Sequence, residues 1–184
     1  MKDYKSEDMT KILLSEQQIA TAIEELGKRL TVDYAGREIT VVGVLKGSVT
    51  FMVDLMRQIK LPLTIDFMSV SSYGSGVKTS GVVKIIKDLD RSIEGKDVLI
   101  VEDILDSGMT LSYLMGMLRE RHPASIRIAT LLDKPERRLV DIHPDYTCFT
   151  IPDAFVVGYG LDFDEQYRNL PYVGILSPRI YGGA

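Results

Sequence analysis

Apolar residues recur with helical spacing in three segments of the chain. The first runs from Ser15 to Leu30, where Ser15 and Gln18 also form the capping-box pattern typical of a helix start. The apolar positions of the other two are Phe51, Met52, Leu55, Met56 and Ile59, and then Leu111, Leu114, Met115 and Leu118. Ser48 is a candidate cap for the second of these predicted helices.

Short, continuous apolar runs lie between these helices, a pattern typical of strands buried on both faces. The predicted strands are 39–45, 63–70, 82–87, 97–101, 125–132 and 155–160. The small, polar, Gly-rich segment 71–81 is predicted to be a mobile loop. Because strands alternate with helices, we expect an α/β fold with a twisted, mostly parallel sheet flanked by helices, and ligands at the carboxyl ends of the strands.

Composition limits the class of protein. The 184 residues predict one domain spanning 1–184, and 45% hydrophobic residues suffice for a core. The net charge of −4 argues against nucleic acid as a partner. The chain has a single cysteine, Cys148, and we find neither a signal-peptide pattern nor an apolar run of the ~20 residues that span a bilayer. We therefore expect a cytoplasmic protein with no membrane partner.

The clearest chemical signal follows the predicted strand 97–101, where two acids, Glu102 and Asp103, stand side by side. Burying an isolated carboxylate is costly, so acids at a buried strand end need a metal or hydrogen-bond donors. The pair therefore points to a polyol or a metal-bound ligand. The alternative is that both are solvated turn residues.

Directly after the acids, the segment Asp106-Ser107-Gly108-Met109-Thr110 precedes a predicted helix. Hydroxyl groups, a glycine and the first amides of a helix favour a phosphate group. The alternative is that Asp106 and Thr110 only cap the helix.

The whole run from Val98 to Leu111 resembles the phosphoribosyl diphosphate (PRPP) motif of the type I phosphoribosyltransferases: an apolar strand, two acids, two aliphatic residues and then Asp-Ser/Thr-Gly-x-Thr. The resemblance implies that family's fold, with a small base-binding hood, and Mg²⁺ as cofactor. Met109 stands where some relatives have Lys, so this position offers no cationic side chain to a phosphate. Backbone amides would still supply most of the phosphate-binding groups.

Further segments resemble the hypoxanthine-guanine phosphoribosyltransferases. Leu45-Lys46-Gly47-Ser48 is similar to their pyrophosphate loop, which has a cis peptide before the Lys, and Ser72-Tyr73-Gly74 to part of their closing loop. Segments 131–134 and 151–163 are similar to their purine-binding segments. The implied PRPP-binding residues are Lys46, Gly47, Glu102, Asp103, Asp106, Ser107, Gly108, Met109, Thr110 and Arg168.

The same resemblance implies roles around the base. Lys134 would recognise the purine 6-oxo group, Phe155 would stack on the purine, and Val156 would bond its edge through the backbone. Asp162 would help to hold the metal together with the acid pair, and Arg168 would contact pyrophosphate. Taken alone, Phe155 and Val156 would be interpreted as parts of a core strand, and Lys134 as a solvated lysine.

The implied function is purine salvage: transfer of the phosphoribosyl group of PRPP to hypoxanthine or guanine, giving IMP or GMP and pyrophosphate, with Asp106 handling the proton on purine N7. Self-association as a homodimer or homotetramer is also implied. Two alternatives stay open, a regulatory RNA-binding protein of the same fold and a phosphoribosyltransferase for another base such as xanthine or uracil.

Overall fold

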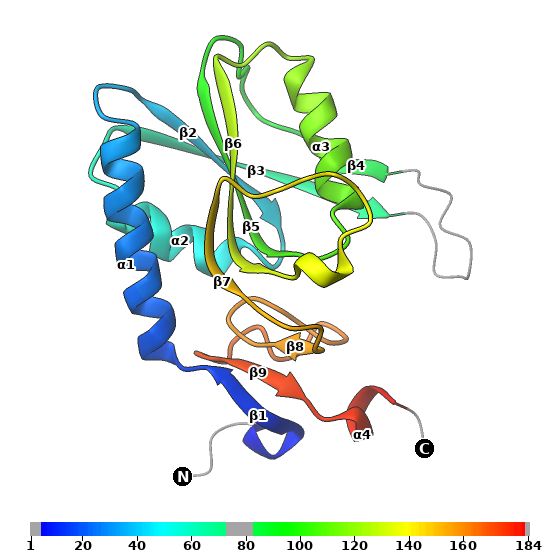
Figure 1. Ribbon diagram of the computed structural model, residues 1–184. Coiled ribbons are helices and arrows are strands. Elements are labelled where there is room, and N and C mark those ends of the chain that lie inside the picture. Colours follow the sequence, from blue (N-terminus) through cyan, green and yellow to red (C-terminus); the bar gives the residue numbers. More distant parts are fainter. Residues whose placement is uncertain (1–4, 73–82, 183–184) are drawn as a thin grey trace.

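The computed structural model describes residues 5–72 and 83–182 of the chain. Its centre is a six-stranded sheet with the order β4-β3-β2-β5-β6-β7 (Figure 1). The strands are β2 (Ile39–Leu45), β3 (Leu63–Ser72), β4 (Val83–Lys87), β5 (Asp97–Leu105), β6 (Ser125–Asp133) and β7 (Tyr146–Thr150). All neighbours from β3 to β7 pair in parallel, and β4 joins β3 antiparallel. The prediction of a mostly parallel sheet is confirmed.

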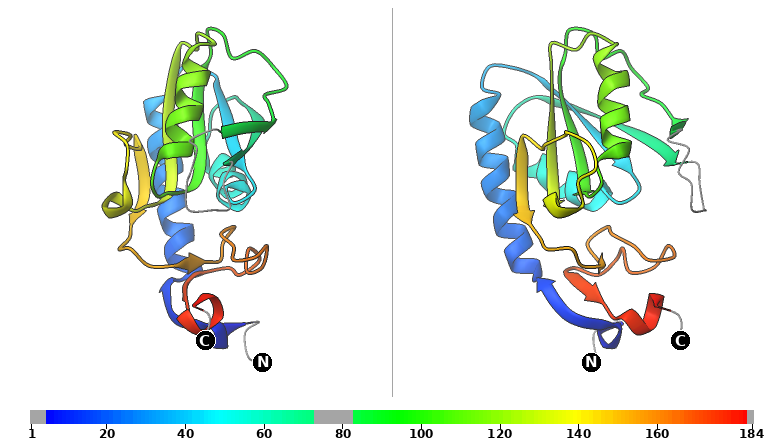
Figure 2. Two further views of the ribbon diagram at one scale, coloured as in Figure 1. Left: turned by 90° about the vertical axis from the view of Figure 1, so that its right-hand side faces the viewer. Right: turned by 45° about the vertical axis from the view of Figure 1, so that its right-hand side comes forward.

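Helices cover both faces of this sheet (Figure 2). They are α1 (Glu16–Asp33), α2 (Val49–Gln58) and α3 (Met109–Arg119). The buried residues of α1 and α2 form one core cluster with Val41 and Leu99, whereas those of α3 form another with Val42 and Ile100. Because successive strand residues point to opposite faces, β2 and β5 are buried on both sides, which explains their continuous apolar sequences.

A second, three-stranded antiparallel sheet lies beyond the carboxyl ends of the parallel strands (Figure 1). It consists of β1 (Met9–Leu14), β9 (Val173–Leu176) and β8 (Val156–Val157), and the short helix α4 (Pro178–Tyr181) follows β9. We call these four elements the hood. Two 3₁₀ turns, η1 (Ser6–Asp8) and η2 (Pro135–Arg137), complete the described elements.

The predicted helix starts agree with the structure, with one change at α2. At α1 the capping box is formed, since the Ser15 hydroxyl accepts from the Gln18 amide and the Gln18 side chain accepts from the Ser15 amide. Ser48 precedes α2, but its side chain makes no cap. Its Oγ instead donates to the Val44 carbonyl at 2.7 Å, which ties the loop after β2 back to the strand.

The largest differences between predicted and observed strand boundaries are at β5 and β8. β5 continues to Leu105, so the acid pair lies inside the strand, where β6 supplies hydrogen-bonding partners beyond the apolar run. β8 is limited to Val156–Val157, because Gly158 and Gly160 have φ angles of 98° and 100° and turn the chain there. Of the predicted Gly-rich loop, residues 71–72 belong to β3, and 73–81 lie outside the described residues.

Strands β1, β7 and β9 were not predicted. They are short, and each contains polar residues or glycine without a clear alternation. Among the described residues, no helix has the length and apolar character needed to cross a membrane.

The surroundings of two helical glycines predict that replacement by alanine would change the free energy of unfolding in opposite directions. A Cβ at Gly27 of α1 would lie 2.3 Å from the Cβ of Gln58 on α2, whereas a Cβ at Gly116 of α3 would meet nothing within 4 Å. We expect Gly27→Ala to lower the free energy of unfolding by about 1–3 kcal/mol through overpacking. Gly116→Ala, its control, should raise that energy by about 0.5–1 kcal/mol through helix propensity. Urea denaturation measures both, and stabilisation by both substitutions would contradict the α1–α2 contact.

Candidate active site

The acid pair lies near the carboxyl end of β5 and is poorly neutralised. No hydrogen bond or ion pair to the Glu102 carboxylate is found within the described residues, and the Asp103 Oδ1 accepts from the Ile104 amide at 2.8 Å. Burial, and secondarily the charge of Asp103, raises the pKa of Glu102 well above its usual range. Burial raises the pKa of Asp103 to about 6, although nearby backbone amides and Arg168 oppose this. A cation or a set of hydroxyl donors would stabilise the ionised form of both carboxyls.

Two glycines bring other segments against the acid pair. A Cβ at Gly47 would lie 1.6 Å from the Asp103 Oδ2, and a Cβ at Gly160 would lie 2.2 Å from the Gly47 carbonyl oxygen. Only glycine permits this approach of the three segments. The Leu45–Lys46 peptide is cis, as the resemblance implies.

The two expected pyrophosphate cations, Lys46 and Arg168, share one carboxylate. The Oε2 atom of Glu165 lies 3.0 Å from the Nζ of Lys46 and 3.4 Å from the Nη2 of Arg168. The Arg168 Nη2 also pairs with Asp162 at 2.8 Å, and its Nη1 donates to the Gly160 carbonyl at 2.8 Å. The arrangement therefore places an anionic oxygen between both cations. Sequence reasoning missed Glu165, for which the motif pattern gave no signal.

The segment from Asp106 to Thr110 forms a loop at the start of α3. Gly108 is the N-cap residue with φ 80°, and α3 has no side-chain cap. Asp106 and Thr110 are therefore not helix caps, which excludes that alternative. The first amides of a helix have no partner within the helix, so those of Met109 and Thr110 are suited to an anion. The side chain of Met109 is 38% exposed.

The turn after β6 holds this loop in place. Arg138 donates from Nε to the Asp106 carbonyl at 3.0 Å and from Nη2 to the Leu105 carbonyl at 3.2 Å. Arg138 also pairs with Asp133, and the Leu139 amide donates to the Ser107 carbonyl at 3.0 Å. The backbone of the loop is thus fixed by contacts that the local sequence does not specify.

The carboxylate of Asp106 has a partner that sequence reasoning missed. The Arg137 Nε donates to the Asp106 Oδ1 at 3.0 Å, and the Arg137 Nη1 lies 3.5 Å from an Asp153 carboxylate oxygen. Arg137 belongs to η2, so it links the loop before α3 to the segment before Phe155.

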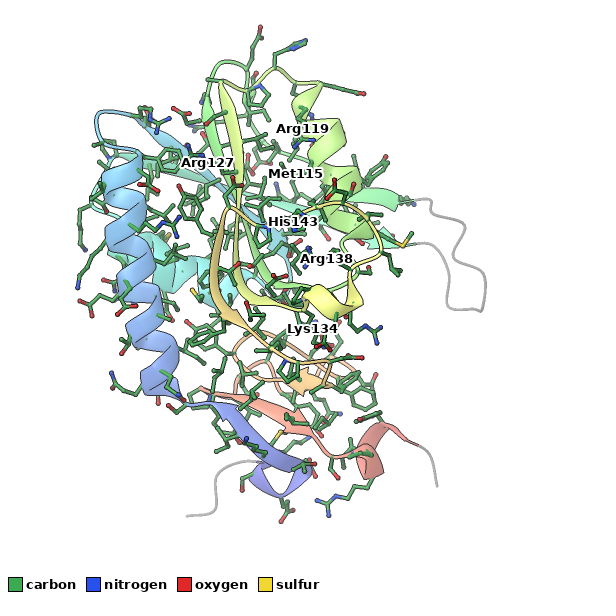
Figure 3. The ribbon with its side chains drawn as sticks, viewed as in Figure 1. Met115, Arg119, Arg127, Lys134, Arg138 and His143 are labelled. Atoms are coloured by element: carbon green, nitrogen blue, oxygen red, sulfur yellow. The ribbon has the colours of Figure 1, made fainter. Side chains whose placement is uncertain are left out.

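Lys134 directly follows β6 (Figure 3). Its side chain is buried, and the exposed fraction of the residue is only 6%. Its Nζ donates to the Ala154 carbonyl at 2.6 Å. Burial lowers the pKa of Lys134, against the charges of Asp106 and Asp153. The alternative of a solvated lysine is therefore wrong.

Phe155 and Val156 differ in their surroundings. Val156 is buried in β8 and pairs with Ile175 of β9, as a core strand residue would. Phe155 is 40% exposed, and its ring stacks on the Tyr181 ring with 4.7 Å between centroids. Phe155 is therefore not an ordinary core residue.

One cavity of about 750 Å³ brings several of these groups together, with residues of the large sheet on one side and of the hood on the other; Glu102, Lys46, Arg168 and the 107–110 segment do not line it. Its lining includes the predicted site residues Asp103, Asp106, Lys134, Phe155, Val156 and Asp162. This volume suits a small-molecule ligand. Another cavity, of about 630 Å³ between α1, α2 and the 159–171 segment, contains Arg168 but neither the acid pair nor the Asp106 loop. Ser72 ends β3, and Tyr73 of the predicted closing loop lies outside the described residues.

Comparisons with known proteins agree with this geometry. Residues 9–164 match the family model for the phosphoribosyl transferase domain. The chain is 55% identical to the hypoxanthine-guanine phosphoribosyltransferases of Streptococcus thermophilus and Bacillus subtilis, over 95% of this chain and 97% of each relative. A crystal structure of a hypoxanthine phosphoribosyltransferase from Staphylococcus aureus has a TM-score of 0.95 and 52% identity, covering 98% of both chains.

The chain belongs to the hypoxanthine-guanine phosphoribosyltransferase family. It is also 56% identical to the bifunctional protein TilS/HprT of Listeria monocytogenes, of which it spans only 27% of the length. Family membership confirms both the resemblance and the expected type I phosphoribosyltransferase fold. The expected class of enzyme, a pentosyltransferase of purine salvage, agrees with this family.

Because the pKa of Asp103 is raised in the folded protein, the free energy of unfolding should depend on pH. A carboxyl whose pKa rises from 3.8 to about 6 on folding stabilises the fold below about pH 4 and loses that contribution as the pH rises through 6. We expect Asp103→Asn to raise the free energy of unfolding at pH 7.5 by on the order of 1–2 kcal/mol, without ligands or metal. The gain should shrink towards pH 4.5.

Urea denaturation at both pH values measures this gain. Asp141→Asn is the matched control, because the Asp141 side chain is 96% exposed and its removal should change little at either pH. A gain for Asp103→Asn that is equal at the two pH values would contradict the proposed cost of ionisation.

Proposed function

We propose that this chain transfers the phosphoribosyl group of PRPP to hypoxanthine or guanine, giving IMP or GMP and pyrophosphate. The observation that carries the proposal is the single cavity in which Asp103 and Asp106 of the sheet edge face Lys134 and Phe155. One side has the chemistry for a sugar phosphate, and the other has the chemistry for a 6-oxopurine.

PRPP would bind along the carboxyl edge of the sheet. Its 5′-phosphate would accept from the amides and hydroxyls of the 107–110 segment, supported by the α3 dipole. Glu102 and Asp103 would accept from the ribose hydroxyls. The pyrophosphate would bind Lys46, the Gly47 amide and Arg168, taking the position of the Glu165 carboxylate between the two cations.

The residues also fit a Mg²⁺ ion that arrives with substrate. Among the described residues, no three His, Cys, Asp or Glu side chains gather into a preformed metal site. Mg²⁺ commonly binds through one or two carboxylates together with substrate phosphates. The un-neutralised acid pair and Asp162 would supply such oxygens, and bound Mg²⁺ would stabilise the negative charge on the leaving pyrophosphate.

In the reaction the bond between the anomeric carbon and the pyrophosphate oxygen breaks, and both electrons leave with pyrophosphate. Positive charge develops on the ribose, where the carboxylates of the acid pair stabilise it. The purine nitrogen N9 forms the new bond. Asp106, released from Arg137, accepts the proton that N7 loses in this direction and donates it back in the reverse reaction.

Lys134 is suited to select the base. Its Nζ already donates to a carbonyl, that of Ala154, and the 6-oxo group of hypoxanthine or guanine is an equivalent acceptor. Phe155 offers an exposed ring for stacking, and the backbone of Val156 lies next to it. Adenine presents an amino group at the same place, and a lysine ammonium cannot accept from it.

A base-by-base assay with PRPP tests the proposal. We expect transfer to hypoxanthine and guanine, no transfer to uracil, little to adenine, and loss of activity when EDTA removes divalent metal. Preferential transfer to xanthine or uracil would favour the alternative of another base. RNA binding without transfer to any base would favour a regulatory protein. Self-association as a dimer or tetramer and a cytoplasmic location stay predictions, the former testable by light scattering.

Asp106→Asn tests the proton-transfer role. The variant keeps the shape of the loop but cannot take a proton, so kcat should fall by about 10²–10⁴-fold. Calorimetry with PRPP and Mg²⁺ is the control and should give an affinity close to that of the wild type. A near-normal kcat would leave Asp106 with only its structural link to Arg137.

Lys134→Ala tests base selection. A hydrogen bond to a charged group contributes roughly 1.5–3 kcal/mol, so KM for hypoxanthine and guanine should rise at least about tenfold. Their advantage over adenine in kcat/KM should narrow, with the KM for PRPP little changed. Lys96→Ala, an exposed lysine at the opposite end of β5, is the control. An unchanged ratio between the bases would assign selectivity to the backbone near Val156.

A further inference from the structure

Three aromatic rings form a cluster at the hood end of the large cavity. The Phe155 and Tyr181 rings stack with 4.7 Å between centroids and 22° between planes. Phe163 meets both rings edge-on, at 5.7 Å from Phe155 and 6.4 Å from Tyr181. Tyr181 and Phe155 both line the cavity, and each is about two-fifths exposed, at 41% and 40%. The Phe155 ring is therefore oriented mainly by other rings rather than by a closed core.

Tyr181 reaches this position because α4 is fastened to the opposite end of the chain. The Ser177 amide donates to the Asp8 carbonyl at 2.8 Å, and Arg179 lies 3.9 Å from an Asp8 carboxylate oxygen. Arg179 also donates to the Glu7 carbonyl. These polar contacts with η1 hold α4 together with Ile180, which is partly buried and packs against the cluster that contains Val157 and Leu176. Because Tyr181 itself is 41% exposed, loss of its ring should leave the core intact.

The arrangement leaves one face of Phe155 for a ligand. α4 lies at the end of the hood away from the large sheet (Figures 1 and 2), whereas β8, which directly follows Phe155, is the hood strand nearest to that sheet. Lys134 comes from the end of β6, and its Nζ contacts the carbonyl of Ala154, the residue before Phe155. A flat base held by Lys134 would therefore stack on the face of Phe155 opposite Tyr181.

We propose that Tyr181 is a positioning residue for the purine, a role that rests on the proposed function. Its ring fixes the orientation of Phe155, so that the base stacks on a preset surface and does not have to order a mobile side chain on binding. The effect should appear in the affinity for the base and not in that for PRPP, which binds at the sheet edge.

Steady-state kinetics of Tyr181→Ala tests this role. We expect KM for hypoxanthine and guanine to rise about 3- to 10-fold, with kcat and the KM for PRPP unchanged. Tyr181→Phe keeps the ring and should match the wild type. Tyr181→Leu keeps apolar volume without a ring and should behave like the Ala variant. Tyr113→Ala, which removes a 44% exposed tyrosine from α3, is the matched control and should have no effect.

The possible results separate the alternatives. An unchanged purine KM in the Ala and Leu variants overturns the proposal, and a lowered KM overturns it by showing that the Tyr181 ring occupies the place of the base. An equal rise in the KM of purine and PRPP, together with a lower melting temperature, assigns Tyr181 a purely structural role. If the wild type transfers no base, the proposed function fails and this inference with it; if the wild type is active, only the inference is at stake.

Discussion

Burial of the parallel strands on both faces is the constraint on which the rest of the structure depends. β2, β5 and β6 lie between two layers of helices, so polar side chains reach a ligand only where these strands end. The cis peptide loop, the acid pair and Lys134 all occur at that edge. The hood closes the space beyond it and contributes the aromatic side of the cavity.

The electrostatics of the site follow from that burial. Several cationic side chains of the site contact groups of the chain itself that resemble the proposed ligands. A carboxylate of Glu165 lies between Lys46 and Arg168, as a pyrophosphate oxygen would, and the Ala154 carbonyl accepts from Lys134, as a 6-oxo group would. On the proposed function, substrate binding would exchange one partner for a similar one, which limits the cost of desolvation.

The acid pair is the exception. Burial raises the pKa of both carboxyls, and the described residues place no cation in contact with Glu102. On the proposed function, ligand hydroxyls or a metal would offset the free-energy cost of keeping these acids at the sheet edge. Stability and function are therefore opposed at this point of β5.

Several helices, strands and one loop of this protein can be predicted from its sequence alone. Segments rich in apolar residues indicate β2, β5 and β6, because strands buried on both faces contain few polar residues, and the capping box indicates the start of α1. The loop from Asp106 to Thr110 is also recognisable, because a phosphate site at a helix start needs small and hydroxyl residues in consecutive positions.

Which distant groups meet is visible only once the chain is folded. The pairing of β1 with β9 joins Met9 to Leu176, and the contacts of Arg137 with Asp106, Glu165 with Lys46 and Tyr181 with Phe155 depend on how the hood and the η2 turn sit against the sheet. Hydrophobic periodicity reports which face of an element is buried. It holds no information on the partner across a cavity, because that partner is set by the path of the chain through space.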